Sequence, residues 1–352
     1  MEIAILGAGG FIGSHLVEYL VAGSSHHVMA VDISRDKLAG IPDRHFTFLA
    51  CDVRRDRALV EKTIRDADVV VDLIAHANPS IYVTSPIEVF ELNFLQNLDI
   101  AKLCIKHGRR LVQFSSAEVY GKADGGDAFS EEHTDFIVGP IHKQRWIYAS
   151  AKALLERLLY AYGVAGELEY TILRPFNFIG SRIDYLVPAN AVGGPRVFPH
   201  FLSALRTGGP IRLVDGGWVH RTFLHIDDGA AAFQAILDDP DAARNQIFNV
   251  GNPDNNVTIR ELAALMIELY GEITGTPPVS DVVDISGEAF YGAGYEDGDR
   301  LPPDVSKLRA LGWAPVRDLR TTLRDAMCAF LDAPQSAPRS PSLVDARLAG
   351  ES

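Results

Sequence analysis

Short apolar runs alternate with amphipathic stretches along the first half of the chain. Apolar runs occupy residues 2–6, 26–32 and 67–75, and amphipathic stretches occupy residues 11–23 and 88–108. Further apolar runs follow at residues 109–116 and 170–175. Such a run predicts a buried strand of a parallel sheet, and an amphipathic stretch between two runs predicts a crossover helix. The alternation therefore predicts an α/β fold with a doubly wound parallel sheet.

The pattern changes at Phe176, where loops rich in Gly, Pro and Asn begin. A helical stretch at residues 199–208 and a strand-like run at 210–215 interrupt these loops. Residues 220–237 and 246–251 again have the pattern of a helix followed by a buried strand, so we expect them to return to the main sheet. The chain is thus predicted to form a main domain and a smaller C-terminal substrate-binding lobe.

The predicted boundaries follow these changes of pattern. The main domain takes residues 1–175 and about 222–250, and the lobe takes residues 176–221 and 251–332. Residues 333–352 are rich in Pro and Ser and have little apolar periodicity. We predict that they form a disordered tail.

Composition limits the partners that the protein could have. The chain has 352 residues, of which 47% are hydrophobic, and this is enough to bury a large core. The formal net charge is -13, and no stretch gathers Lys and Arg. Because a nucleic-acid partner requires clustered positive charge, we expect no nucleic acid to bind.

The cysteines and the apolar runs indicate the compartment. Cys51, Cys104 and Cys328 form no close pair and no metal-ligand spacing, so we expect neither a disulfide framework nor a metal site. The N-terminus begins an apolar run without a basic leader, and no apolar stretch approaches the roughly 18 to 20 residues of a membrane span. We therefore expect a cytoplasmic protein that does not bind a membrane.

A glycine-rich turn follows the first predicted strand and opens a helix. Gly7, Gly10 and Gly13 have the spacing of a dinucleotide-binding turn. The glycines allow a tight turn, close approach to a pyrophosphate and close helix packing. Phe11 and Ile12 begin the helix, whose N-terminus supplies amide donors and a favourable dipole. The turn predicts a Rossmann-type domain that binds a dinucleotide.

An acidic residue makes this prediction more specific. Asp32 ends the second predicted strand, about 20 residues after the glycines, where a carboxylate accepts hydrogen bonds from the adenosine ribose. A carboxylate also repels a 2′-phosphate, so NAD is favoured over NADP. Arg35 lies close enough in the sequence to keep NADP open.

Weaker cofactor contacts are expected at the ends of two further strands. Asp52, followed by Val53, could contact the adenine amino group, and a solvated carboxylate at a strand end is an equal alternative. Leu73 and Ala75 would bring backbone near the cofactor, although any buried parallel strand has this pattern.

Tyr148 and Lys152 lie four residues apart on a predicted helix and share one face. A neighbouring ammonium and a positive nicotinamide would lower the tyrosine pKa from its reference of about 10 and make the phenol a usable base. The spacing alone is common by chance. Ser115 and Ser116 end an apolar run upstream, where a hydroxyl can hydrogen-bond a reacting alcohol. Together with the glycine turn, these residues predict an enzyme.

Several segments of the chain resemble the extended short-chain dehydrogenase/reductases that act on nucleotide sugars. The most similar branches are the UDP-apiose/UDP-xylose synthases and the UDP-glucuronate decarboxylase domain of the polymyxin-resistance enzyme. The segments that carry the resemblance are GAGGFIGSHL, FSSAEVYGK, KQRWIYASAK, RPFNFIGSRID, LVDGGWVHRTFLHIDD, IFNVGNPDNNVTIRELA and FYGAGYEDGDRLPPDV. The resemblance covers nearly the whole chain.

The resemblance implies a shared oxidation step. Tyr148, supported by Lys152 and Ser116, would remove the proton of the sugar C4 hydroxyl while NAD takes the hydride, which gives a 4-keto sugar. In the decarboxylases, this ketone lies β to the C5 carboxylate and serves as the electron sink for loss of carbon dioxide. Two elements assist there, namely a Ser or Cys followed by Glu, and an arginine near the C-terminal substrate loop.

This sequence departs from the decarboxylase pattern at both elements. Ala117 precedes Glu118, so the acid is kept and the hydroxyl or thiol is lost. A gapless match puts Leu301 at the arginine position, and Arg300 could serve if the extra proline shifts the register. Glu118 could be a general acid/base that faces C5 or a carboxylate that only orients hydroxyl groups.

Three net reactions are then open. Epimerisation at C4 makes the fewest demands, so we predict NDP-sugar 4-epimerisation ahead of UDP-glucuronate decarboxylation, with 4,6-dehydration third. A non-catalytic NAD-binding regulator is a further alternative, but such proteins often lose the tyrosine or the lysine, and both remain here.

The resemblance also implies contacts to the nucleotide-sugar substrate. The expected contacts are His76, Asn78, Ala117, Asn177, Arg182, Arg221, Tyr291 and Arg300. Surface salt bridges are the alternative for Arg182 and Arg221, and a structural role is the alternative for His76.

The resemblance finally implies a homodimer. Helices at about residues 90–107 and 146–163 would pack against their mates. The apolar face with Leu154, Leu155, Leu158 and Leu159 permits this packing, and it permits burial in the core of one chain equally well.

Overall fold

The computed structural model describes residues 1–332 apart from 24–25, 43, 45 and 184–195. The predicted disordered tail at 333–352 therefore lies outside the described residues. Within the described part, no helix is long and apolar enough to cross a membrane.

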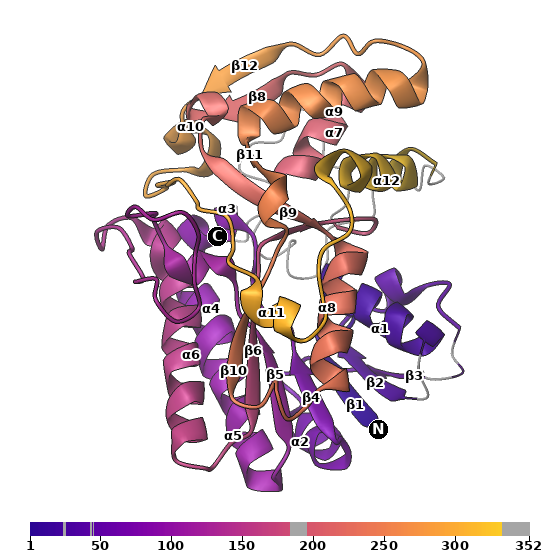
Figure 1. Ribbon diagram of the computed structural model, residues 1–352, viewed down its shortest axis with the longest axis vertical. Helices are drawn as coiled ribbons and strands as arrows, with labels where there is room; N and C mark the ends of the chain where they lie inside the picture. Colours follow the sequence, from indigo (N-terminus) through magenta and orange to yellow (C-terminus); the bar gives the residue numbers. More distant parts are fainter. Residues whose placement is uncertain (24–25, 43, 45, 184–195, 333–352) are drawn as a thin grey trace, which may run out of the picture.

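Seven parallel strands form the main sheet, in the order β10-β6-β5-β4-β1-β2-β3 (Figure 1). They are β1 (Glu2–Leu6), β2 (His27–Asp32), β3 (Phe46–Ala50), β4 (Val69–Asp72), β5 (Arg110–Phe114), β6 (Tyr170–Pro175) and β10 (Gln246–Val250). The strand order reverses where β1 lies between β2 and β4. In doubly wound sheets, ligands bind at the carboxyl ends of the strands on either side of such a switch point. The predicted doubly wound parallel sheet is confirmed.

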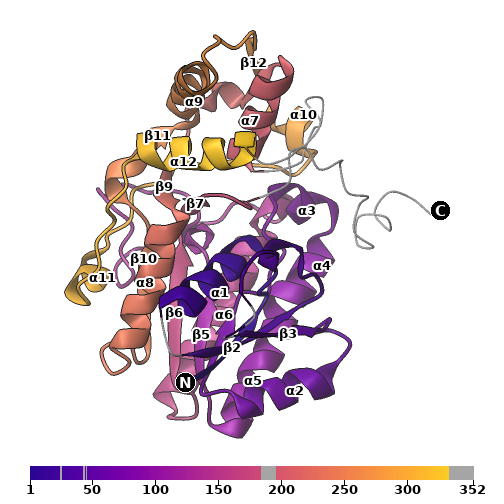
Figure 2. The same ribbon diagram turned by 90° about the vertical axis from the view of Figure 1, so that its right-hand side faces the viewer.

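Helices cover both faces of the main sheet (Figure 2). The helices α1 (Phe11–Gly23) and α8 (Ile226–Asp238) pack together in the core of one face. The core of the other face includes α2 (Arg57–Asp66), α5 (Asn97–His107) and α6 (Ile147–Val164). Both faces are apolar, which explains why the strands between them read as nearly continuous hydrophobic runs.

A helical segment ahead of α5 departs from regular α-helix. The short helices α3 (Pro79–Thr84) and α4 (Pro86–Phe90) lead into a π-helical stretch, Glu91–Gln96. Asn93 is fully buried in this stretch, and its amide bonds both the backbone N–H of His76 (2.8 Å) and the backbone carbonyl of His76 (3.0 Å). The stretch thus ties the helix to the loop that follows β4.

The smaller lobe lies above the carboxyl ends of the main strands (Figure 1). Its sheets join β7 (Asn177–Ile179), β9 (His220–His225) and β11 (Asn256–Thr258), and β8 (Ile211–Val214) with β12 (Val282–Ile285). Its helices are α7 (Val197–Thr207), α9 (Ile259–Thr274), α10 (Gly287–Tyr291) and α12 (Leu319–Asp332). The short helix α11 (Ser306–Ala310) packs against β10 of the main sheet.

The return of residues 220–251 to the main sheet is confirmed for β10 and wrong for β9. Strand β10 pairs with β6, whereas β9 pairs in parallel with β7 and antiparallel with β11. Strand β9 is buried along most of its length and continues directly into α8, so its pattern resembles that of a main-sheet strand. Apolar periodicity reports burial and does not identify the pairing partner.

The leucines of the predicted dimer face of α6 have different environments. Leu155 and Leu159 are buried in the core of the chain, whereas Leu154 is 43% exposed. Exposed apolar side chains also occur at Tyr160 in the same helix and at Ile87 in α4, which packs against α6. The homodimer stays a prediction.

Candidate active site

The glycine turn connects β1 to α1 at the switch point of the sheet. Gly7 has φ +89°, which favours glycine, and a Cβ there would lie 3.2 Å from the backbone of Leu73. A Cβ at Gly13 would overlap the carbonyl oxygen of Gly7. Gly9 lies outside the predicted triplet, yet a Cβ on it would overlap the carbonyl oxygen of Ser34. The turn therefore needs four glycines, of which the spacing rule predicts three.

Asp32 lies directly beside this turn. Its carboxylate accepts hydrogen bonds from the backbone N–H of Gly9 (2.9 Å) and of Ser34 (3.1 Å). Burial raises the pKa of Asp32, and the hydrogen bonds act against that rise. Arg35 packs its guanidinium over the rings of Phe46 and Phe48 on β3. The geometry fits a carboxylate that is held in place for an adenosine ribose.

Asp52 is engaged with arginines of its own loop. Its carboxylate binds Arg54 (3.0 Å) and Arg55 (3.4 Å), and the hydrogen bond from Arg54 is the main reason that its pKa is lowered. Val53 is buried in the core that contains α2. These contacts match the alternative of a strand-end carboxylate, and an adenine contact stays a prediction.

A cavity of about 300 Å³ lies between the main sheet and the lobe. Its wall on the main-domain side includes Phe11, Ile12, Leu73, Ala75, Ser116 and Tyr148. Its wall on the lobe side includes Phe198, His200, Phe201, Arg212, Val214, Arg221, Phe223, Ile259, Phe290 and Tyr291. Predicted cofactor and catalytic residues thus meet predicted substrate residues in one cavity.

Tyr148 and Ser116 meet in this cavity. Burial raises the pKa of Tyr148 to about 12, and a hydrogen bond with Ser116 acts against that rise. The Nζ of Lys152 donates to the carbonyl oxygen of Phe114 (3.1 Å), and burial lowers the pKa of Lys152 to about 8. The predicted lowering of the tyrosine pKa includes the charge of a bound nicotinamide and stays a prediction, because the chain alone raises this pKa. Desolvation of the phenolate outweighs the favourable interactions that the chain supplies.

Asp72 is a buried acid that interacts with Lys152, and the sequence did not predict it. Its fully buried carboxylate accepts hydrogen bonds from Asn97 and from the backbone N–H of Ile74 (2.9 Å). Burial raises the pKa of Asp72, while its negative charge raises the pKa of Lys152. An acid inside the apolar run VVVDLIA was the available signal, because a buried carboxylate requires partners.

Two stacked tyrosine pairs line the cavity. The ring of Tyr82, in α3, stacks on the ring of Tyr148, with 4.6 Å between ring centroids and 12° between ring planes. Tyr291 stacks on Tyr295 at 4.2 Å. Sequence reasoning selected Tyr291 and missed Tyr82 and Tyr295, although Tyr295 belongs to the quoted segment FYGAGYEDGDRLPPDV.

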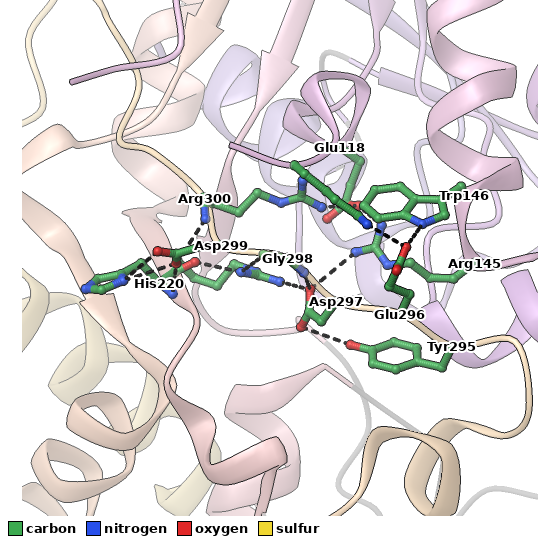
Figure 3. A network of polar contacts seen from close by, with 12 residues as sticks. Glu118, Arg145, Trp146, His220, Tyr295, Glu296, Asp297, Gly298, Asp299 and Arg300 are labelled. Atoms are coloured by element: carbon green, nitrogen blue, oxygen red, sulfur yellow. Dashed lines mark hydrogen bonds and ion pairs between the residues drawn. The ribbon is translucent and has the colours of Figure 1, made fainter. Parts of the chain in front are cut away.

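A network of charges forms the wall next to Ser116 (Figure 3). Glu118 binds the Nη1 of Arg145 (2.5 Å) and the Nη2 of Arg300 (3.0 Å). Burial acts to raise the pKa of Glu118, but the two guanidinium groups outweigh it and hold the pKa well below its usual range. Burial lowers the pKa of Arg300 to about 10, so its guanidinium keeps its charge at neutral pH.

Asp297 extends this network toward β9. It binds Arg221 and lies 4.0 Å from Arg145. The guanidinium groups of Arg145, Arg221 and Arg300 thus surround only two carboxylates, which leaves one positive charge in excess. Within the described part of the chain, the Nε of Arg145 and the Nη1 of Arg300 are buried without a hydrogen-bond partner. Such a wall favours an anionic ligand group.

Residues 295–300, which carry Asp297 and Arg300, are held against Trp146 and Lys122 through Glu296. The indole N–H of Trp146 donates to Glu296 (2.7 Å), which also binds Lys122 (3.0 Å). The guanidinium groups of Arg145 and Arg300 lie 4.5 and 5.6 Å from the Trp146 ring centroid. Arg145 and Trp146 were also missed, although both precede Tyr148 within KQRWIYASAK.

The other predicted substrate contacts divide into two groups. Asn177 lines the cavity and donates to the carbonyl oxygen of Thr222 (3.0 Å), and Ala117 lines a second, smaller pocket together with Arg300. Arg182 lies outside the described cavity lining, where its guanidinium binds Glu18, the His15 ring (3.0 Å) and the Lys37 carbonyl oxygen (3.1 Å).

His76 and Asn78 have structural roles in the described chain. His76 is held through its backbone by Asn93, and Asn78 caps α3 by accepting from the N–H of Ser80 (3.0 Å). The cavity wall takes Ala75, Ala77 and Pro79 from this segment and neither of the two predicted side chains. The predicted substrate contacts at His76, Asn78 and Arg182 are therefore not brought into the described cavity. The side chains of Asn78 and Arg182 bond local partners, whereas His76 is held through its backbone.

The profile of a family described as "NAD dependent epimerase/dehydratase" matches residues 3–251. The UDP-D-apiose/UDP-D-xylose synthase of Oryza sativa subsp. japonica is 40% identical, over 93% of this chain and 88% of its own length. The UDP-D-apiose/UDP-D-xylose synthase 1 of Arabidopsis thaliana is 39% identical, over 93% of this chain and 90% of its own length.

A solved structure, the PbgP3 protein from Burkholderia pseudomallei, is 35% identical and superposes with a TM-score of 0.82. The superposition covers 94% of this chain and 96% of that one. The UDP-glucuronic acid 4-epimerase from Bacillus cereus superposes with a TM-score of 0.78 at 20% identity, over 94% and 99% of the two chains. That identity supports the shared fold alone.

Proposed function

The chain belongs to the NAD-dependent epimerase/dehydratase family, and we propose that it decarboxylates UDP-glucuronate through a 4-keto intermediate. NAD-dependent modification of a nucleotide sugar is the established part of this assignment. The observation that carries the proposal is the pairing of Arg300 with Glu118 (3.0 Å) beside Ser116. The sequence alone favours 4-epimerisation, whereas this contact and the relatives favour the alternative.

The residues at the switch point fit NAD. The glycine turn leaves the backbone space that a pyrophosphate needs, and Asp32 is held where a ribose would lie. Phe11, Ile12, Leu73 and Ala75 line the part of the cavity beside the turn. When bound, NAD supplies a hydride acceptor that later returns the hydride.

Tyr148 has the position of the base for the oxidation step. Its phenolic oxygen would take the proton from the sugar C4 hydroxyl, and the Ser116 hydroxyl would hydrogen-bond the same oxygen. Because the pKa of Lys152 is about 8, its side chain is mostly protonated at neutral pH. Its ammonium group would then supply positive charge for the phenolate. Substrate and cofactor must still lower the Tyr148 pKa, because burial alone raises it.

Loss of carbon dioxide would follow from the 4-keto intermediate. The bond between C5 and the carboxyl carbon breaks, its electron pair moves into the C4 enolate, and a proton then replaces the carboxyl group at C5. Tyr148, now protonated, and Ser116 would stabilise the enolate oxygen by hydrogen bonds. Arg300 would bind the departing carboxylate, because its Nη1 is buried, unpartnered within the described residues and adjacent to Glu118.

Glu118 fits an orienting role better than that of a general acid. The two guanidinium groups keep it ionised throughout the neutral range, so it holds no proton to donate. Its carboxylate instead fixes Arg145 and Arg300 in one orientation. The loss of a hydroxyl or thiol at Ala117 leaves Ser116 as the hydroxyl of this turn.

The test is incubation of the NAD-loaded protein with UDP-glucuronate and with neutral UDP-hexoses, followed by mass spectrometry and proton NMR. Loss of one carbon dioxide from UDP-glucuronate is expected. A product of unchanged mass with a new C4 configuration would show an epimerase instead. A Tyr148→Phe variant is the matched control, because it keeps the ring that stacks on Tyr82 and removes the base.

A further inference from the structure

His200 is a buried polar residue at the lobe end of the cavity. It lies in α7, is 3% exposed and contributes to the cavity wall. Within the described residues, its Nε2 has no hydrogen-bond partner. Most buried polar atoms in folded proteins are hydrogen-bonded, so an unpaired nitrogen beside a binding cavity suggests that a ligand completes it.

Among the described residues, the neighbours of His200 that the contacts identify are apolar side chains and Arg212. Its ring meets the ring of Phe290 edge-on, with 5.2 Å between ring centroids and 79° between planes, and it lies near Phe201 at 6.1 Å. Val214 and Ile259 also line this end of the cavity. Burial lowers the pKa of His200 to about 4, and the charge of Arg212 adds to that effect. The imidazole is therefore neutral at physiological pH.

The two ends of the cavity have different chemistry. Ser116, Tyr148 and Glu118 belong to main-domain segments of the cavity wall, whereas His200 and Phe290 belong to the lobe helices α7 and α10 (Figure 1). A nucleotide sugar that reacts at Tyr148 must extend its nucleotide away from the reacting carbon. Aromatic and aliphatic walls with a few fixed polar groups are typical of a site for a planar base.

We propose that His200 recognises the nucleobase of the substrate by donating its Nε2–H to the O4 carbonyl oxygen of uracil. The proposal rests on the proposed function only in requiring a nucleotide-sugar ligand. Uracil has a carbonyl where cytosine has an amino group, so a fixed N–H donor favours uridine nucleotides over cytidine nucleotides. With the imidazole proton on Nε2, the amino group of cytosine would face this N–H donor to donor, and one buried group would lose its partner.

The test is calorimetric titration of the NAD-loaded protein with UDP, CDP and inorganic pyrophosphate. We expect the wild type to prefer UDP over CDP by roughly tenfold, the effect of one buried hydrogen-bonding group left unpaired. In a His200→Phe variant, which keeps a ring against Phe290, UDP affinity should fall by roughly tenfold and the preference should disappear. Pyrophosphate affinity should stay unchanged, because the phosphates do not contact His200.

A His200→Gln variant is the conservative partner, because its side-chain amide can still donate a hydrogen bond. It should keep most of the preference for UDP, and NAD titration with thermal unfolding verifies that both variants fold. Equal UDP and CDP affinities in the wild type would overturn the proposal without any variant, as would an unchanged ratio in His200→Phe. Binding of UDP is measured without turnover, so absence of decarboxylation leaves this test intact.

Discussion

The glycine turn and the charged wall differ in how the chain builds them. The turn uses consecutive residues 7–13 together with Asp32, and its requirement is empty space beside the backbone. The charged wall joins Glu118, Arg145 and the segment 295–300, which are far apart in the sequence. The first is a property of local backbone geometry, whereas the second exists only after the two lobes pack together.

This difference predicts different responses to substitution. Backbone space has no substitute, because any side chain collides with neighbouring main-chain atoms. The charged wall has partial redundancy, since two guanidinium groups share the carboxylate of Glu118 and two carboxylates surround Arg145. Changes in the turn should therefore act in an all-or-none manner, and changes in the wall should act in a graded manner.

The largest effect is expected from Gly13→Val. Its side chain would overlap the carbonyl oxygen of Gly7, so NAD binding should be lost and the free energy of unfolding should fall by about 3 kcal/mol. Fluorescence titration with NADH and denaturant unfolding measure these two quantities. Gly23→Ala in the same helix is the control, because a Cβ there meets nothing within 4 Å. Normal NADH binding by Gly13→Val would contradict the idea that this space is essential.

The next largest effect is expected from Arg300→Met. Removal of the charge beside Glu118 should lower the rate of carbon dioxide release by about 10²- to 10³-fold. NADH binding should persist, because the cofactor side is untouched. Arg182→Met is the control, since Arg182 lies outside the described cavity lining and should keep the wild-type rate within a few-fold. If Arg182→Met loses more activity than Arg300→Met, the assignment of the substrate wall is wrong.

A pH effect is expected from Arg145→Gln. In the wild type, the two guanidinium groups outweigh burial and depress the Glu118 pKa, so Glu118 stays charged and contributes no acid limb in the neutral range. Loss of Arg145 raises this pKa, and the rate should then fall as the pH drops through the new value. The stability that the ion pair contributes follows the same sign, because it is present above the unfolded-state pKa of Glu118 and is lost on acidification.

Rate profiles from pH 5 to 8, each expressed relative to the rate at pH 8, measure this change, which should reach roughly tenfold at the acid end. The control is Arg54→Gln, which removes the partner of another carboxylate, Asp52, away from the described cavity wall. Identical profiles for Arg145→Gln and the wild type would show that Glu118 does not act through its charge.

The smallest effect is expected from Glu296→Ala, which frees the charged segment from Trp146. The rate should fall roughly three- to tenfold, because Arg300 loses part of its support while keeping Glu118. Glu296→Gln keeps an acceptor for the indole N–H and should recover most of the rate. Lys122→Ala is the control, because it removes the ion pair to Glu296 and the ammonium over the Trp146 ring but leaves the indole hydrogen bond to Glu296. Steady-state rates and KM values that do not differ among the three variants would show that this contact is structural only.

Much of the fold could be predicted from the sequence because its signals are local. The apolar runs identified the strands of the main sheet, and the turn at residues 7–13 identified the cofactor edge. The pairing of β9 could not be predicted, since the apolar pattern of a strand does not specify which strand pairs with it. Asp72 was missed for the same reason, because its partners Asn97 and Lys152 come from other elements.

The residues that line the substrate cavity could not be identified from short stretches of sequence. A gapless match of the sequence to the family puts Leu301 at the arginine position. The folded chain instead brings Arg300 to Glu118 and packs Leu301 among apolar side chains. Arg182 and His76 were both predicted as substrate contacts, yet the Arg182 guanidinium binds the His15 ring and the His76 backbone is held by Asn93.

The sequence by itself determined the doubly wound sheet, the NAD turn and the Tyr148–Lys152 pair. Each of these needs only short-range backbone geometry or the spacing of one helix. Only the tertiary structure decided which arginine joins Glu118, that the Nε2 of His200 is buried with no partner among the described residues, and how strongly burial acts on Tyr148. Ion pairing and desolvation depend on distances through space, and these are fixed when segments far apart in the chain pack together.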